Sequence, residues 1–125
     1  MKNKLRNITV AGQAFVYWYS SGESFILNIS PKNMKTSKIT LEFIADAPDD
    51  DPIMFWAFYM IHAVKNNAEA SICLTSPKNI AELISFLLND NENLFTKGHT
   101  RIINAMDLLN KMGYTNLSPV WKREW

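Results

Sequence analysis

Nine apolar residues follow one another from Ile53 to Ile61, directly after Asp51 and Pro52. A segment that is apolar around its whole circumference must be buried on several sides. The aspartate offers an acceptor at a helix N-cap, and proline suits the first helical position because no backbone N–H is needed there. The sequence therefore predicts a helix over 52–66 that forms the centre of the core and ends at a pair of asparagines.

The acidic residues before this segment have side chains that a hard cation accepts as ligands. They are Asp46, Asp49, Asp50 and Asp51. Their spacing lacks the alternating ligands and the glycine of a calcium loop, whereas a helix N-terminus attracts acidic side chains through its dipole. We interpret them as capping groups, and we predict neither a metal nor a cofactor.

The chain before the apolar segment has the pattern of β-strands. Two β-rich runs flank a tight-turn signal at 20–23, and a third run over 38–45 alternates apolar with polar residues. In the first run one face carries Phe15, Tyr17 and Tyr19, and the opposite face carries Val16 and Trp18. Both faces are bulky, so this strand is either covered on two sides or keeps one face for a partner.

Two more helices are predicted after the apolar segment. Ser76 and Pro77 repeat the Asp-Pro arrangement, and the apolar residues that follow form one stripe. A third helix is expected over 100–112, because Gly113 provides a C-terminal stop. The predicted fold is a single α+β domain over 1–125, with an antiparallel sheet of three to four strands in 5–46, three helices and a short strand at 70–75 in 52–113, a tail at 114–125, and the order β-β-β-α-β-α-α.

Composition and charge restrict the class of protein. The chain is 47% hydrophobic and 20% charged, as in ordinary globular proteins, and its single cysteine excludes an intramolecular disulfide. The net charge of +1 argues against a dedicated nucleic-acid binder. Residues 1–41 carry six Lys and Arg against one Glu, whereas residues 42–62 carry five acidic residues and no Lys or Arg. Such a bipolar chain suits intramolecular pairing, a charged protein partner or a solvated surface.

No segment indicates export or membrane insertion. The basic start of the sequence lacks the apolar stretch of a signal peptide, and the longest apolar run is shorter than the ~20 residues that cross a bilayer. We therefore expect a cytoplasmic protein that does not contact a membrane.

Residues with catalytic potential are isolated from one another. Cys73 lies in a β-like segment without a neighbouring base, and His62 has no second histidine on its predicted helix. The sequence lacks the motifs for nucleotide binding, for a serine nucleophile and for zinc catalysis. We leave the enzyme class open and favour a role without catalysis.

Two segments resemble a group of small uncharacterised bacterial proteins that have an ITV-x-G-x-x-[YF] strand and a P-K-x-I-x-E-[LF]-I helix. The matching residues are Ile8, Thr9, Val10, Gly12 and Phe15 in the first segment and Pro77, Lys78, Ile80, Glu82, Leu83 and Ile84 in the second. The resemblance implies a small bacterial or phage-borne domain and carries no activity with it.

The preferred hypothesis is a small interaction module, such as an immunity or inhibitor protein, that uses an aromatic and charged surface. Its grounds are the bipolar charge, the 12% of aromatic residues and the missing catalytic motifs. The candidate surface comprises Phe15, Tyr17, Tyr19, Lys32, Lys35, Lys38, Trp121 and Trp125. The two C-terminal tryptophans either complete the core or contact the partner, which is another protein or a second copy of the chain.

Two alternatives stay open. A ligand-binding protein or enzyme would hold a pocket between the sheet and the helix at 52–66, with Tyr17, Tyr59, His62 and Cys73 as its candidate lining. Single-stranded nucleic-acid binding is the weaker alternative, in which strand aromatics stack on bases and lysines contact phosphates.

Overall fold

The computed structural model describes residues 5–20, 24–34, 36–44, 56–90, 95, 98 and 100–123. These residues form eight strands and two helices. The strands are β1 (Arg6–Val10), β2 (Gln13–Ser20), β3 (Phe25–Pro31), β4 (Lys38–Phe43), β5 (Trp56–Lys65), β6 (Ala68–Cys73), β7 (Thr100–Asn104) and β8 (Thr115–Arg123). The helices are α1 (Pro77–Asp90) and α2 (Ala105–Lys111).

The strands divide into two sheets. The larger has five strands in the order β1-β2-β3-β4-β7, and the smaller has three in the order β6-β5-β8. Neighbouring strands are antiparallel except β4 and β7, which are parallel. The α+β class is confirmed. The expected single sheet with three helices is corrected, because the described residues contain more strands and fewer helices.

Alternation along the strands separates the two faces of the five-stranded sheet. Phe15 and Tyr17 of β2 share a face with Leu27 of β3 and Leu41 of β4, and all four side chains are buried. Because successive residues of a strand point to opposite faces, Trp18 lies on the other side of the sheet. The alternation predicted for the third run is confirmed in β4.

Two hairpins turn on residues with positive φ. Only Ala11 and Gly12 connect β1 to β2, with φ values of 54° and 79°. Asn66 and Asn67 connect β5 to β6 in the same way, with φ values of 56° and 62°. Two-residue loops with positive φ at both positions are type I′ turns, whose twist matches that of the flanking strands. The asparagine pair is therefore a hairpin turn and not a helix end. Of the turn predicted at 20–23, residues 21–23 lie outside the described residues.

The helix predicted over 52–66 is wrong, because this segment contains β5. Buried Ile61 and Ala63 alternate with exposed His62, which is the period of a strand. β5 is the central strand of its sheet and pairs with β6 and β8. An apolar run fits a buried helix and a central strand equally well, and the pairing with β6 and β8 distinguishes them. Asp46, Asp49, Asp50, Asp51 and Pro52 lie outside the part of the chain that the structure describes.

The helix predicted from Ser76 and Pro77 is confirmed. α1 begins at Pro77, and the backbone N–H of Ile80 donates a hydrogen bond of 3.0 Å to the carbonyl of Ser76. Its apolar stripe is buried and comprises Ile80, Leu83, Ile84 and Leu87.

The helix predicted over 100–112 is shorter, because its first residues form β7. Asn104 Oδ1 accepts hydrogen bonds from the backbone N–H groups of Met106 at 3.0 Å and Asp107 at 3.2 Å, which fixes Asn104 as the N-cap of α2. Ile102 has helical spacing to Met106, but its backbone pairs with β4 and its side chain is 65% exposed. The tail without a clear period is also corrected, since it contains β8.

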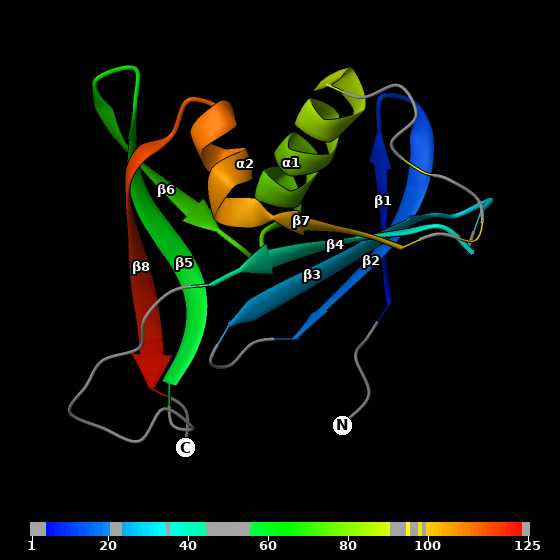
Figure 1. The fold of residues 1–125 in the computed structure, drawn as a ribbon, viewed down its shortest axis with the longest axis horizontal. Coiled ribbons are helices and arrows are strands. Elements are labelled where there is room, and N and C mark those ends of the chain that lie inside the picture. Colours follow the sequence, from blue (N-terminus) through cyan, green and yellow to red (C-terminus); the bar gives the residue numbers. More distant parts are fainter. Residues whose placement is uncertain are drawn as a thin grey trace.

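The core lies between the two sheets and the two helices (Figure 1). Phe25 of β3, Ile61 of β5, Ile84 of α1 and Leu109 of α2 are each at most 1% exposed. Both helices cover the same face of the five-stranded sheet, and the opposite face carries neither of them (Figure 1). No helix among the described residues is long and apolar enough to cross a membrane.

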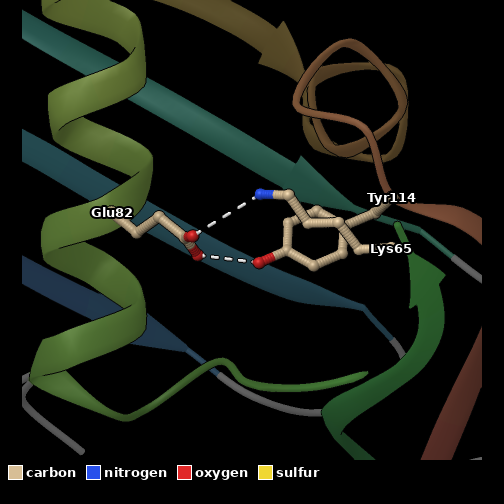
Figure 2. A network of polar contacts seen from close by, with 3 residues as sticks. All are labelled: Lys65, Glu82 and Tyr114. Carbon is tan, nitrogen blue, oxygen red and sulfur yellow. Dashed lines mark hydrogen bonds and ion pairs between the residues drawn. The ribbon is translucent and has the colours of Figure 1, made fainter. Parts of the chain in front are cut away.

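Three polar residues join β5, α1 and the entry to β8 (Figure 2). Tyr114 Oη donates a hydrogen bond of 2.9 Å to Glu82 Oε1, and Lys65 Nζ lies 3.9 Å from Glu82 Oε2. The Lys65 ammonium also lies 4.5 Å from the centre of the Tyr114 ring. The network connects the three-stranded sheet to the helix layer. The ion pair is partly exposed and contributes little free energy, because water screens both charges.

Candidate interaction surface

The face of the five-stranded sheet opposite the helices, called the outer face below, carries apolar side chains that the core does not use. Val16, Trp18 and Ile26 are half-buried there, and Ile102 is largely exposed. An antiparallel sheet with one face in the core normally presents polar residues on its other face. Apolar side chains on an uncovered face are typical of an interaction surface.

A hollow of about 450 Å³ lies on the outer face where β1, β2 and β3 meet. It is called the Trp18 groove and is lined by Leu5, Asn7, Val16, Trp18, Ser30 and Lys32. Leu5 is 61% exposed, so one apolar wall of the groove stands in water. Trp18 adds a large flat ring with one N–H donor. An indole, an aliphatic side chain and an ammonium group together suit a ligand with an apolar group beside a carboxylate.

Ser30 fixes the loop that carries Lys32. The buried Ser30 hydroxyl donates a hydrogen bond of 2.6 Å to the carbonyl of Ser37. The Lys32 backbone N–H donates a hydrogen bond of 3.0 Å to the carbonyl of Ala14. Both ends of this loop are therefore tied to the sheet, which holds the Lys32 backbone in one position beside the groove.

A second lysine lies next to the Trp18 groove. Ile29 pairs with Ile39, so Lys38 at the start of β4 occupies the position beside Ser30 on the outer face. With Lys32, it gives this end of the outer face two positive charges. The groove is therefore complementary to an acidic surface.

The middle of the outer face is polar. Asn28 pairs with Trp18 on one side and with Thr40 on the other, and Thr40 Oγ1 donates a hydrogen bond of 2.8 Å to Asn28 Oδ1. Thr40 in turn pairs with Ile102. This polar pair separates the Trp18 groove from the exposed isoleucine of β7.

The aromatic residues predicted for the surface belong to the other face of the sheet. Phe15 and Tyr17 are 0% and 2% exposed, so they pack in the core and cannot present a surface. Tyr19 is half-buried, with its ring stacked on Phe25 at 5.2 Å and covered by the Arg6 guanidinium at 5.0 Å. The correction follows from the choice of sheet face, because the helices cover the Phe15 side of β2.

The remaining predicted surface residues are divided between the two sheets. Lys32 and Lys38 flank the Trp18 groove, whereas Trp121 belongs to β8 and pairs with Phe58 of β5. Lys35 and Trp125 lie outside the described residues. Among the described members of the predicted surface, Lys32 and Lys38 therefore belong to the five-stranded sheet and Trp121 belongs to the three-stranded sheet.

The pocket predicted between the sheet and a helix at 52–66 is not formed, because that helix is replaced by β5. Tyr17 lies in the core of the five-stranded sheet, and Tyr59 is a half-buried residue of β5. Cys73 is half-buried at the end of β6, with its Sγ 3.4 Å from Thr75 Oγ1. His62 points to solvent, so these four side chains do not converge.

His62 instead lines a hollow of about 620 Å³ on the three-stranded sheet. Its Nδ1 lies 2.9 Å from Ser71 Oγ on the neighbouring strand, and Glu69 and Asn116 line the same hollow. Ser71 and His62 are both exposed. A histidine activates a serine best when a third group orients the imidazole, and the contact with Ser71 is the one side-chain hydrogen bond of His62 found among the described residues.

The residue of this candidate surface that the sequence does not single out is Trp18, which lines the groove. Trp18 alternates with Tyr17 along the strand, but two bulky faces on one strand do not show which face the core will use.

Three comparisons were made, with protein-family models, with curated proteins and with solved structures. None of them found a match to this chain.

Proposed function

We propose that this chain is a small protein-interaction module of the immunity or inhibitor type that binds a protein partner through the Trp18 groove. The partner presents an apolar side chain flanked by a carboxylate. The observation that carries the proposal is an indole and a 61% exposed leucine lining one hollow beside Lys32. A folded domain gains nothing in stability from exposing Leu5 to water.

The rigidity of the strand beneath the groove supports tight binding. Trp18 stands between Tyr17, which is 2% exposed, and Tyr19, which stacks on Phe25. Because the neighbours on the core face fix the backbone of β2, little conformational entropy is lost when Trp18 meets a partner. Buried tryptophans supply a large share of the free energy in protein interfaces.

The charges beside the groove define the partner's chemistry. Lys32 lines the groove and Lys38 lies next to it, while the acidic Glu42 lies toward the other end of β4. An acidic partner surface would approach faster and in one orientation, because opposite charges steer association. This argues for a carboxylate on the partner opposite Lys32.

Affinity capture from a lysate of the source organism, followed by titration of the purified partner, tests the proposal. Trp18→Ala and Lys32→Glu should each weaken the purified complex at least about tenfold. His62→Ala, an exposed change on the other sheet, is the matched control and should leave affinity unchanged. A captured protein that binds both groove variants as tightly as the native chain would refute the proposal.

The same titration separates a protein partner from a nucleic acid. Contacts to phosphates make affinity fall steeply with salt, whereas an interface with an apolar centre is much less sensitive. A captured ligand that is lost on nuclease treatment and shows the steep salt dependence would replace the protein partner with single-stranded nucleic acid.

A further inference from the structure

The edge of the five-stranded sheet formed by β7 has an unusual composition. β7 pairs with β4 on one side and is the last strand in the sheet order. Among the described residues, large hydrophobic side chains that are exposed comprise Leu5, Met34, Ile44 and Ile102. Of these, Ile102 lies inside a strand. An open edge with an apolar side chain invites pairing with another strand, and proteins usually protect such edges with charge or proline.

The other edges of the two sheets carry such protection or a polar outer face. β8 contains Pro119, which cannot donate to a further strand, and β6 contains the exposed Glu69. On β1 the outer-face residues Asn7 and Thr9 are polar. Only for β7 do the described residues combine an open edge with an exposed aliphatic side chain.

We infer that β7 pairs in antiparallel fashion with β7 of a second copy of this chain, about a two-fold axis at Ile102. This register sets Ile102 against Ile102 of the second copy and Thr100 against Asn104 of the second copy. The outer face of β7 carries Thr100, Ile102 and Asn104, which are polar, apolar and polar. This pattern is the same in both strand directions, so an antiparallel copy matches it. A two-fold interface requires such self-complementarity.

Charges beside the edge fit the same arrangement. A hollow of about 340 Å³ runs along β7 and is lined in part by Asp90, Arg101, Asp107 and Lys111. Two acidic and two basic side chains there allow each copy to offer the other an opposite charge. A cluster of charges of one sign would repel the same cluster on a second copy. The mixed charges beside β7 avoid this repulsion.

The pairing joins two five-stranded sheets and places two Trp18 grooves on one continuous outer face. It does not depend on the proposed partner, because the groove and the β7 edge are separated by the Asn28–Thr40 pair. The paired strands have five residues each, so their interface is smaller than a standard one. We expect self-association in the micromolar range.

Register-specific cross-linking tests the inference. Ile102→Cys in a Cys73→Ser background should form a disulfide-linked dimer on mild oxidation, because directly opposed residues have Cβ atoms about 4.5–5.5 Å apart. Thr100→Cys in the same background is the matched control, since two copies of residue 100 would be about 13 Å apart in this register. At least tenfold faster cross-linking at residue 102 is expected. Equal rates at both positions, or no dimer at residue 102, would overturn the inference.

Sedimentation equilibrium of the unmodified chain gives an independent measure. The average mass should rise above the 14.4 kDa monomer as concentration increases. Ile102→Lys should weaken self-association at least tenfold, whereas Thr9→Lys on the opposite edge should not. Both residues are exposed, so both variants should keep the native circular dichroism spectrum. A chain that stays monomeric up to about 0.5 mM would contradict the pairing. Trp18→Ala should leave the mass unchanged, so the two proposals can fail separately.

Discussion

Tyr114 donates a hydrogen bond to Glu82 over 2.9 Å and thereby fixes the entry to β8 against α1 (Figure 2). Burial, the hydrogen bond to Glu82 and the negative charge of that carboxylate together raise the pKa of Tyr114 to about 12, with burial as the largest cause. The neutral phenol is therefore favoured in the folded state. Its ionisation would leave two negative charges facing each other.

The stability of the fold should accordingly fall in strong alkali. A tyrosine whose pKa is higher in the folded than in the unfolded chain stabilises the fold fully below pH about 10. This contribution, about 1–2 kcal/mol, is lost as the pH rises from about 10 through about 12. Burial also raises the pKa of Tyr17, which adds a loss of the same sign. Urea unfolding of the native chain and of Tyr114→Phe between pH 8 and pH 11.5 measures the effect.

At pH 8 the phenylalanine variant should be less stable by about 1 kcal/mol, because it lacks one hydrogen bond. The difference between the two chains should shrink as the pH rises. Glu82→Gln keeps an acceptor without the charge and is the control for the hydrogen bond itself. A stability difference that stays constant across this pH range would contradict the assigned pKa.

The Ala11–Gly12 turn should accept a stabilising substitution. Ala11 has a φ of 54°, a conformation that costs a residue with a Cβ atom roughly 1 kcal/mol. Asparagine tolerates this conformation, and Asn-Gly is the favoured pair for a type I′ turn. Ala11→Asn should therefore raise the free energy of unfolding by about 0.5–1 kcal/mol. The measurement is thermal unfolding, with Ala14→Asn in the adjacent strand as a control expected to give no gain.

Truncation of the neighbours Tyr17 and Trp18 should destabilise the fold to different extents. Tyr17→Ala removes a core side chain that is 2% exposed and should cost about 3–5 kcal/mol. Trp18 is half-buried on the outer face, and Trp18→Ala should cost less than about 2 kcal/mol. Chemical unfolding of both variants gives the comparison. A larger loss at Trp18 than at Tyr17 would show that the assignment of the two sheet faces is reversed.

The parts of the fold that could be predicted from the sequence are those specified locally. Ser76 and Pro77 mark the start of α1, and the alternation through Ile39, Leu41 and Phe43 marks β4. Each signal depends on residues within one element. These predictions needed no knowledge of the partner strands.

The parts that could not be predicted depend on contacts between distant residues. Ile61 belongs to a strand and not to a helix because β8, more than fifty residues later, pairs with it. Trp18 becomes a surface residue because α1 and α2 cover the Tyr17 side of the sheet. Alternation shows that two faces exist, but long-range packing decides which of them is buried. The aromatic residue of β2 on the candidate surface is therefore Trp18, one position from the predicted Tyr17 and Tyr19.

The N-cap residue of α2, Asn104, should determine where β7 ends and the helix begins. Asn104 Oδ1 accepts hydrogen bonds from the N–H groups of both Met106 and Asp107, which the helix itself leaves unpaired. Asn104→Ala should lower the free energy of unfolding by about 1 kcal/mol, whereas Asn104→Asp should retain most of the stability because its carboxylate accepts the same bonds. Urea unfolding monitored by circular dichroism measures both variants. If alanine and aspartate destabilised the fold equally, the two hydrogen bonds would not be what ends β7 and begins α2 at this residue.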